Sequence, residues 1–338
     1  MSESALDQVV SDLRSSGSKY FPQHAEAKAV RVVGHTPKPD HYTYEIVLDF
    51  PSGSERVNAK VYRSRNGSRS PQESALREAQ NLQFAHDIAE HRALSGVPRP
   101  VGDFAALGAV VSTKVHGLPL QSIIMKAALL PGDGNHQLLE TAAAQAGAWL
   151  QHFHRASTVT AIPLDATSVL SEIERLCAKA QNDGLPSIST EAILGKAKAA
   201  LARQKRPLRA SAVLREFIPL NILVAEDSVG FCEFAAMSEQ GHSLLDVAIF
   251  LAAVEALEKY PFCHRHITAP LQKAFVEAYG VSAQEQPLLD TLKMKVLLQM
   301  FAQGRVIKES AERKKVMWAN VMRRFLQHAA ERSAAKVA

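Results

Sequence analysis

The sequence has few cysteines and no long apolar run. Its three cysteines, Cys177, Cys232 and Cys263, are far apart and odd in number. We therefore expect no disulfide framework. Residues 244–257 form the most apolar run, but charged residues interrupt it and it is too short to cross a bilayer. The chain begins with an acidic, amphipathic segment and not with a signal peptide, so we expect a cytoplasmic protein without a membrane span.

Metal-binding and repetitive patterns are also scarce. The run Cys263-His264-Arg265-His266 contains metal-capable atoms but lacks a second ligand pair at zinc spacing, so we interpret it as a chance cluster. The sequence contains no internal repeat and no low-complexity tract. Hydrophobic residues make up 46% of the chain and charged residues 22%, which is ordinary globular usage. A chain of 338 residues is long enough for two lobes with separate cores.

The charge is mildly basic and concentrated toward the C-terminus. The net charge is +5 and the isoelectric point is near 9.0. Five of the basic residues at that end are Arg313, Lys314, Lys315, Arg323 and Arg324. A solvated helix face explains them, and the same basic helices are a candidate surface for a protein partner. We expect no nucleic-acid binding, because the aromatic or groove-reading context is missing.

The periodicity of the chain predicts an α+β protein with two lobes. Residues 1–27 form a leading helix and lead-in, and residues 28–115 form an N-terminal lobe. That lobe contains a five-stranded antiparallel sheet and one long helix over residues 71–94. Residues 116–338 form a mainly helical C-terminal lobe, in which residues 211–234 are an insert of loop and short strands. The five expected strands cover residues 30–33, 42–50, 56–63, 101–104 and 109–114.

The insert carries the side chains most suited to chemistry. Glu216 and Asn221 lie five residues apart on a loop, a short apolar strand follows, and a second strand ends at Glu233. A hairpin of this kind brings a carboxylate and an amide to its mouth and a second carboxylate to its far end. Oxygen ligands of this type suit Mg²⁺, which needs only one or two protein groups when phosphates supply the rest.

These residues and their order resemble the aminoglycoside phosphotransferase/choline kinase-like family, a branch of the protein-kinase-like fold. The family has His-Gly-Asp, then Asn, then two strands leading to a metal-binding Asp; this sequence has Leu214-Arg215-Glu216, Asn221 and Glu233. Lys60 on the third strand and Glu78 on the helix match the family's phosphate-binding lysine and its ion-pair partner. Lys114 and Gly117 lie in a stretch similar to the family's inter-lobe hinge. The resemblance covers roughly residues 28–300.

The resemblance implies ATP and Mg²⁺ as cofactors and a small hydroxylated molecule as acceptor. Lys60, Glu78, Lys114 and Gly117 would contribute to cofactor binding. Two further groups are implied: Glu216 with Arg215 as catalytic residues, and Asn221 with Glu233 as metal ligands.

Both implied carboxylates of the insert depart from the family. Glu216 and Glu233 stand where the family has Asp, and each is one methylene longer. Phosphoryl transfer depends on positioning, and a displacement of about 1 Å can cost ~10²-fold in rate. The His-Gly pair is replaced by Leu214-Arg215, although protein kinases carry an arginine at the second position. There is also no glycine-rich phosphate loop, because Gly34 stands alone near two prolines.

Three hypotheses therefore remain open at the level of sequence. The first is an ATP-dependent phosphotransferase for a sugar, aminoglycoside-like or amino-alcohol acceptor. The second is a pseudokinase that binds a nucleotide or a partner without transfer. The third is an unrelated α+β protein with similar spacings. Charge is retained at both altered carboxylates, which favours Mg²⁺–nucleotide binding, whereas their greater length disfavours catalysis.

Overall fold

The computed structural model describes residues 4–64, 69–130, 132–226, 228–260 and 262–304, together with Gln327 and Glu331. The chain divides into two compact units. The first comprises Met1–Gly117 and Ala225–Glu239, and the second comprises Leu118–Val224 and Gln240–Ala338. Ala225–Glu239 thus belongs with the first unit, whereas the sequence interpretation assigned residues 211–234 to the helical lobe.

A four-stranded antiparallel sheet forms the centre of the first unit. Its order is β1 (Ala29–Pro37), β2 (His41–Phe50), β3 (Gly53–Tyr62) and β4 (Ala109–Thr113). β-branched and aromatic residues dominate β2, which favours an extended, pleated backbone. β1 extends past Gly34 to Pro37. The pairing with β2 skips one residue of β1 between Val32 and Gly34 and then continues in the shifted register.

The expected fifth strand at residues 101–104 is not confirmed. Only an isolated bridge, Pro100 with Ser112, lies beside β4, with backbone bonds from Val101 N to Val111 O (2.9 Å) and from Thr113 N to Arg99 O (2.9 Å). Prolines at positions 98 and 100 have no N–H to donate. The ladder therefore ends before a strand can form.

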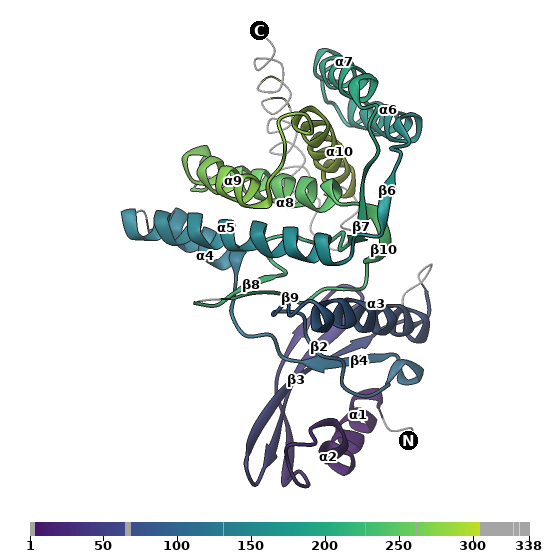
Figure 1. Ribbon diagram of the computed structural model, residues 1–338, viewed down its shortest axis with the longest axis vertical. Coiled ribbons are helices and arrows are strands. Elements are labelled where there is room, and N and C mark those ends of the chain that lie inside the picture. Colours follow the sequence, from purple (N-terminus) through teal and green to yellow (C-terminus); the bar gives the residue numbers. More distant parts are fainter. Residues whose placement is uncertain are drawn as a thin grey trace. The chain divides into compact units, whose positions relative to one another are not determined.

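The two faces of β3 have different partners, as its alternating side chains predict. Val57 and Ala59 are buried in a core shared with Val9 and Leu13 of α1 (Ala5–Ser15). Lys60 and Tyr62 lie on the other face, where they meet α3 (Pro71–His91). Figure 1 shows α3 on one side of the sheet and α1 on the other. The short helices α2 (Gly17–Tyr20) and η1 (Ala105–Leu107) complete this unit.

α3 begins with strong sequence signals and buries one narrow stripe. Ser70 and Glu73 form a capping box, and Pro71 occupies the first turn. The buried stripe has helical spacing and consists of Ala75, Glu78, Leu82, Ala85 and Ala89. Leu76 lies off this stripe and is 50% exposed. Glu78 is the one charged residue of the stripe.

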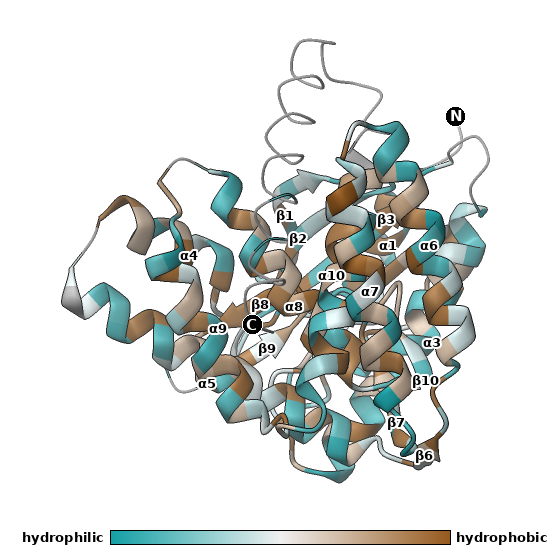
Figure 2. Ribbon diagram, turned by 90° about the horizontal axis from the view of Figure 1, so that it is seen from above, coloured by the Kyte–Doolittle hydropathy of each residue, from teal (hydrophilic) through white to brown (hydrophobic). Residues whose placement is uncertain are grey.

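The second unit is mainly helical. Its helices are α4 (Leu120–Leu129), α5 (Asp133–Ala156), α6 (Ala166–Asn182), α7 (Ser187–Arg203), α8 (Leu244–Ala256), η2 (Leu257–Lys259), α9 (Arg265–Tyr279) and α10 (Gln286–Gly304). Most residues of α8 are buried, and α6, α7 and α10 form a further core with it. In Figure 2 the helices around α8 alternate brown and teal along their length, as amphipathic helices do.

The remaining strands are short, and one of them, β9, belongs to the first unit. They are β5 (Leu118–Pro119), β6 (Thr160–Ile162), β7 (Leu208–Val213), β8 (Ile222–Val224), β9 (Val229–Phe231) and β10 (Ser238–His242). β5 pairs with β8, and β6 pairs with β7, antiparallel in both cases. The loop 214–221, which holds Glu216 and Asn221, therefore runs from β7 to β8.

The C-terminal prediction lies mostly outside the described residues. α10 begins at Gln286 and is described to Gly304. The basic surface proposed for a protein partner, from Arg313 to Arg324, falls outside the described residues. Within the described ranges, no helix combines the length and the apolar character needed to cross a membrane.

Candidate functional site

Lys60 is the centre of a buried charge cluster in the first unit. Its Nζ donates to Glu78 Oε1 at 2.5 Å, to Glu233 Oε1 at 2.9 Å and to the carbonyl of Cys232 at 3.2 Å. The three side chains come from β3, α3 and the segment after β9, which are distant in sequence. The structure thus brings together Lys60, Glu78 and Glu233, three of the residues predicted from the sequence.

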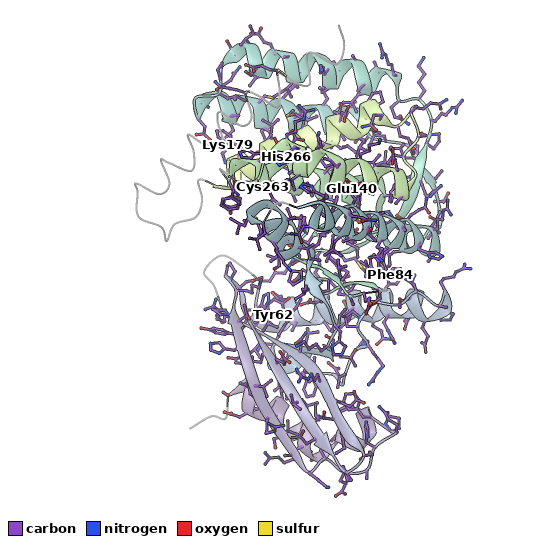
Figure 3. All side chains as sticks on the ribbon, turned by 90° about the vertical axis from the view of Figure 1, so that its left-hand side faces the viewer. Tyr62, Phe84, Glu140, Lys179, Cys263 and His266 are labelled. Carbon is purple, nitrogen blue, oxygen red and sulfur yellow. The ribbon has the colours of Figure 1, made fainter. Side chains whose placement is uncertain are left out.

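Glu78 accepts hydrogen bonds from two groups besides Lys60. The Tyr62 hydroxyl donates to Glu78 Oε2 at 2.5 Å, and the Phe234 amide donates to Oε1 at 3.5 Å. Tyr62 is labelled in Figure 3 on β3, two residues beyond Lys60 and therefore on the same face of the sheet. The sequence analysis did not assign a role to Tyr62.

The electrostatics of the cluster follow from one cation shared by two carboxylates. Burial lowers the pKa of Lys60, but Glu78 and Glu233 outweigh this effect and raise the pKa above its ordinary value. Burial raises the pKa of Glu78, but Lys60 and the Tyr62 hydroxyl bring the net pKa below its ordinary value. For Glu233, burial raises the pKa and the nearby Glu78 adds to it, so the net shift is upward despite Lys60.

The segment that carries Glu233 is fixed by two contacts within the first unit. Asn81, one helical turn after Glu78, donates from Nδ2 to the carbonyls of Phe234 (2.8 Å) and Met237 (3.2 Å). Gly96 meets β9 so closely that an added Cβ would lie 2.0 Å from the Val229 carbonyl oxygen. The sequence analysis missed Asn81, although its spacing of three residues from Glu78 places both on one helix face.

Lys114 and Gly117 also lie in the first unit, where Lys114 takes part in a different ion pair. Lys114 Nζ pairs with Glu45 Oε1 at 2.7 Å, and Arg56 contacts the same oxygen at 2.9 Å. Gly117 has φ 135°, a backbone conformation that favours glycine. A contribution of either residue to cofactor binding stays a prediction.

The second unit holds the loop with Glu216 by means of a buried aspartate. Both side chains of the pair Asp246–His154 have 0% exposure. Asp246 accepts the backbone N–H groups of Leu214 and Arg215, each at 2.7 Å, and contacts His154 Nε2 at 3.1 Å. Tyr279 Oη lies 2.9 Å from His154 Nδ1. A neutral histidine with its proton on Nε2 satisfies both contacts, because Tyr279 then donates to Nδ1.

Glu216, Arg215 and Asn221 are brought together on this loop. Asn221 Nδ2 donates to the Glu216 carbonyl at 3.1 Å, and the Ile218 amide donates to the same carbonyl at 2.7 Å. Arg215 has φ 62°, in the left-handed region that costs a residue with a Cβ about 1–2 kcal/mol. The loop therefore has one compact, partly strained conformation.

The donor set suits a hard cation. The carboxylate of Glu233 and the amide oxygen of Asn221 are the ligand types that Mg²⁺ prefers. Glu233 belongs to the first unit and Asn221 to the second. Within each unit, as far as the described residues go, there is no group of three or more His, Cys, Asp or Glu residues arranged to hold a metal ion. Joint binding of Mg²⁺ by Glu233 and Asn221 stays a prediction.

Comparison with known proteins identifies the fold. No protein-family model and no curated protein matches the chain. Solved structures do match. A glucosamine kinase in complex with glucosamine, ADP and inorganic phosphate has a TM-score of 0.51 at 13% identity, covering 92% of this chain and 96% of that chain.

Two further matches have similar scores. A choline/ethanolamine kinase family protein from Mesorhizobium loti has a TM-score of 0.52 at 13% identity, covering 98% of this chain and 94% of that one. A spectinomycin phosphotransferase in complex with ADP and spectinomycin has a TM-score of 0.52 at 10% identity, covering 96% and 98%. The chain therefore has the protein-kinase-like fold that these phosphotransferases share.

Proposed function

We propose that the protein is an ATP-dependent phosphotransferase that acts on a small hydroxylated acceptor. The observation that carries this proposal is the buried cluster in which Lys60 is held between Glu78 and Glu233. A lysine paired with a helix glutamate is the phosphate-binding arrangement of kinases. It occurs here in a fold shared with small-molecule kinases, two of which were solved with ADP.

The first unit would bind the nucleotide phosphates. Lys60 would donate to α- and β-phosphate oxygens, and Glu78, fixed by Tyr62, would keep the ammonium group in place. Glu233 with Asn221 would hold Mg²⁺, which when bound neutralises phosphate charge during transfer. Glu233 contacts Lys60 at 2.9 Å, so the phosphates would compete with Glu233 for the ammonium group.

The second unit would position the acceptor. Glu216 would orient the acceptor hydroxyl and accept its proton, since a carboxylate is the positioning group that phosphoryl transfer requires. Asp246 would keep the loop in place through the backbone of Leu214 and Arg215. Arg215 would act as a positioning residue through its backbone. Its N–H is fixed by Asp246, and Glu216 is the next residue in the chain.

The solved relatives suggest which acceptors to test. These proteins are named for glucosamine, choline/ethanolamine and spectinomycin. All of these are hydroxyl-bearing molecules with amine or quaternary ammonium groups. We therefore propose a hydroxylated amine as acceptor.

The test is turnover of Mg·ATP with a panel of glucosamine, fructosamine, choline, ethanolamine and spectinomycin. ADP release and ³¹P NMR of the product are measured together, so that transfer is distinguished from ATP hydrolysis. We expect one acceptor class to accelerate ADP release, and Glu216→Gln to lower kcat by ~10²-fold or more without changing ATP affinity. Glu239→Gln, an exposed change in the first unit, is the control. If no acceptor is phosphorylated, the transferase proposal fails.

A pseudokinase is the second candidate. The observation that favours it is the pair of lengthened carboxylates, because Glu233 reaches Lys60 at 2.9 Å. Mg·ATP binding that depends on Lys60, combined with no turnover on any acceptor, would establish this alternative. Restoration of turnover by the double change Glu216→Asp and Glu233→Asp would then identify side-chain length as the cause.

A further inference from the structure

The turn between β1 and β2 offers little backbone hydrogen bonding to a phosphate. Kinases and other phosphate-binding folds commonly use the N–H groups of a glycine-rich loop here. In this chain the turn is Lys38-Pro39-Asp40, and Pro39 has no N–H. The Lys38 N–H already donates to the His41 carbonyl at 2.8 Å.

Arg63 fixes this turn in one conformation. Its backbone N–H donates to the Asp40 carbonyl at 2.9 Å, and its guanidinium donates to the Lys38 carbonyl and stacks 4.4 Å from the Tyr42 ring centroid. A turn held in this way is unlike a glycine loop that folds over its ligand. If the first unit binds a terminal phosphate, another group must supply the hydrogen bond.

His41, the first residue of β2, has the properties of such a group. It is only 5% exposed, and its Nδ1 lies 2.9 Å from Asp40 Oδ1. Its Nε2 is buried and has no hydrogen-bond partner among the residues that the structure describes. A buried polar atom without a partner costs free energy, so it points to a ligand or to a functional constraint.

The strand register places His41 on the face of the Lys60 cluster. His41 is opposite Tyr62, and Thr43 is opposite Lys60, so His41, Thr43, Lys60 and Tyr62 share one face. The His41 and Tyr62 rings have centroids 5.5 Å apart. A protonated His41 ring would lower the pKa of Glu233, which burial raises, and would also lower the pKa of Glu78.

We propose that His41 is a phosphate-binding residue, whose Nε2–H donates to a terminal phosphate oxygen of the nucleotide bound at Lys60. This assignment rests on the proposed function. It gives the site a side-chain donor in the place where related folds use backbone donors, and it gives the buried Nε2 a partner. The ligand class is a nucleoside di- or triphosphate.

The chemistry of the ring requires that binding takes up a proton. The Asp40 carboxylate accepts from Nδ1–H, so the neutral ring presents only a lone pair at Nε2. A phosphate oxygen is an acceptor, and it therefore needs the doubly protonated ring. Hydrogen bonding from His41 lowers the pKa of Asp40, which keeps that carboxylate charged opposite the ring. The other titratable groups on this face are Lys60 and Tyr62 of β3, Glu78 of α3 and Glu233.

The experiment is calorimetric titration of Mg·ATP, Mg·ADP and adenosine into the wild-type protein, His41→Asn and His41→Phe. Titrations at about pH 6 and about pH 8, in buffers of different ionisation enthalpy, count the protons taken up on binding. His35→Asn is the matched control, because His35 lies in the same hairpin but pairs with Tyr44 on the opposite face.

We expect both His41 variants to bind Mg·ATP about tenfold more weakly at about pH 6, which corresponds to about 1.4 kcal/mol. Wild type should take up a proton on binding and lose affinity toward about pH 8, whereas the variants should show neither effect. Adenosine affinity should be unchanged. His41→Phe should unfold at most slightly below the wild-type temperature, because it loses only the Nδ1 contact with the exposed Asp40 and the buried Nε2 has no partner to lose.

The outcomes separate this assignment from the proposed function. A wild-type protein that binds Mg·ATP through Lys60, with equal affinity and equal proton uptake in His41→Asn, overturns the role of His41 alone. A wild-type protein that binds no nucleotide overturns the proposed function and the His41 assignment together. Loss of adenosine affinity in both variants would show a structural role for His41 and would also overturn the assignment.

Discussion

At the scale of single residues, the most informative feature is the dependence of Glu78 on its neighbours. Its side chain is 2% exposed. Lys60 balances its negative charge, and the Tyr62 hydroxyl donates a hydrogen bond to it. A buried carboxylate is stable in its ionised form only while such partners remain. Its folded-state pKa is lowered, so its stabilising contribution is present above the ordinary carboxyl range and is lost as the pH falls through that lowered value.

Replacing the lysine should reverse this pH dependence. In Lys60→Met, burial dominates and raises the folded-state pKa of Glu78 above its unfolded value, so the ionised form becomes unfavourable. We expect a loss of about 3 kcal/mol in the free energy of unfolding at about pH 7, and a clearly smaller loss at about pH 4. Urea unfolding at both pH values measures the difference. An equal loss at the two values would mean that Glu78 is not destabilised by the missing charge.

Arg215 provides a second residue-level prediction, because its φ of 62° is a conformation suited to glycine. Arg215→Gly removes the Cβ clash but increases the freedom of the unfolded chain, so we expect a net gain of about 0.5–1 kcal/mol. Ala93, with φ 51°, is the matched site, and Ala93→Gly should give a similar gain. Chemical denaturation measures both. A destabilised Arg215→Gly would show that contacts of the Arg215 side chain outweigh the strain.

At the scale of elements, the loop between β7 and β8 depends on α8. Asp246 accepts two backbone N–H groups of this loop and contacts His154 of α5. In Asp246→Asn, an NH₂ group replaces one of the two carboxylate oxygens and faces a backbone N–H group that it cannot accept from. We expect a loss of about 3 kcal/mol in the free energy of unfolding. Asp290→Asn on α10, which keeps an amide oxygen to accept from Gln286 Nε2, should change stability by about 0.5 kcal/mol at most. Equal effects of the two changes would contradict the bracing role of Asp246.

The contact between Gly96 and β9 is the corresponding test in the first unit. Gly96 has φ 88° and no room for a Cβ beside Val229. We expect Gly96→Ala to cost about 2 kcal/mol or more, and to weaken nucleotide binding because β9 leads to Glu233. Gly34→Ala is the control, since open space surrounds that position and its φ is not positive; it should be neutral or slightly stabilising. Thermal unfolding of both variants decides whether the close approach matters.

Regular elements with strong local signals could be predicted from the sequence, and irregular ones could not. The Ser70–Glu73 capping box and the β-branched content of β2 determine α3 and β2 locally. The strand expected at residues 101–104 was not confirmed, because the prolines at positions 98 and 100 limit the ladder. The true length of β1 was missed because its pairing resumes beyond the irregularity at Gly34, which requires knowledge of the partner strand.

At the scale of the whole molecule, the assignment of segments to units was the harder problem. A short hairpin pattern near residues 225–234 does not say which core it will join. The structure groups Ala225–Glu239 with the sheet, so that Glu233 meets Lys60. The Lys60–Glu78 pair was predictable from the order of motifs, whereas Tyr62, Asn81 and the buried His154 gain their roles only from tertiary contacts.

The central claim is that Lys60 and its two carboxylates form a site for nucleotide phosphates. Calorimetric titration of Mg·ATP into the wild-type protein, Lys60→Met and Lys273→Met tests it most directly. Lys273 lies on α9 with a side chain that is 75% exposed, so its replacement controls for loss of one positive charge. We predict saturable, magnesium-dependent binding to the wild type and to Lys273→Met, and at least ~10²-fold weaker binding to Lys60→Met. Absence of binding to the wild type, or equal binding to Lys60→Met, would contradict the account.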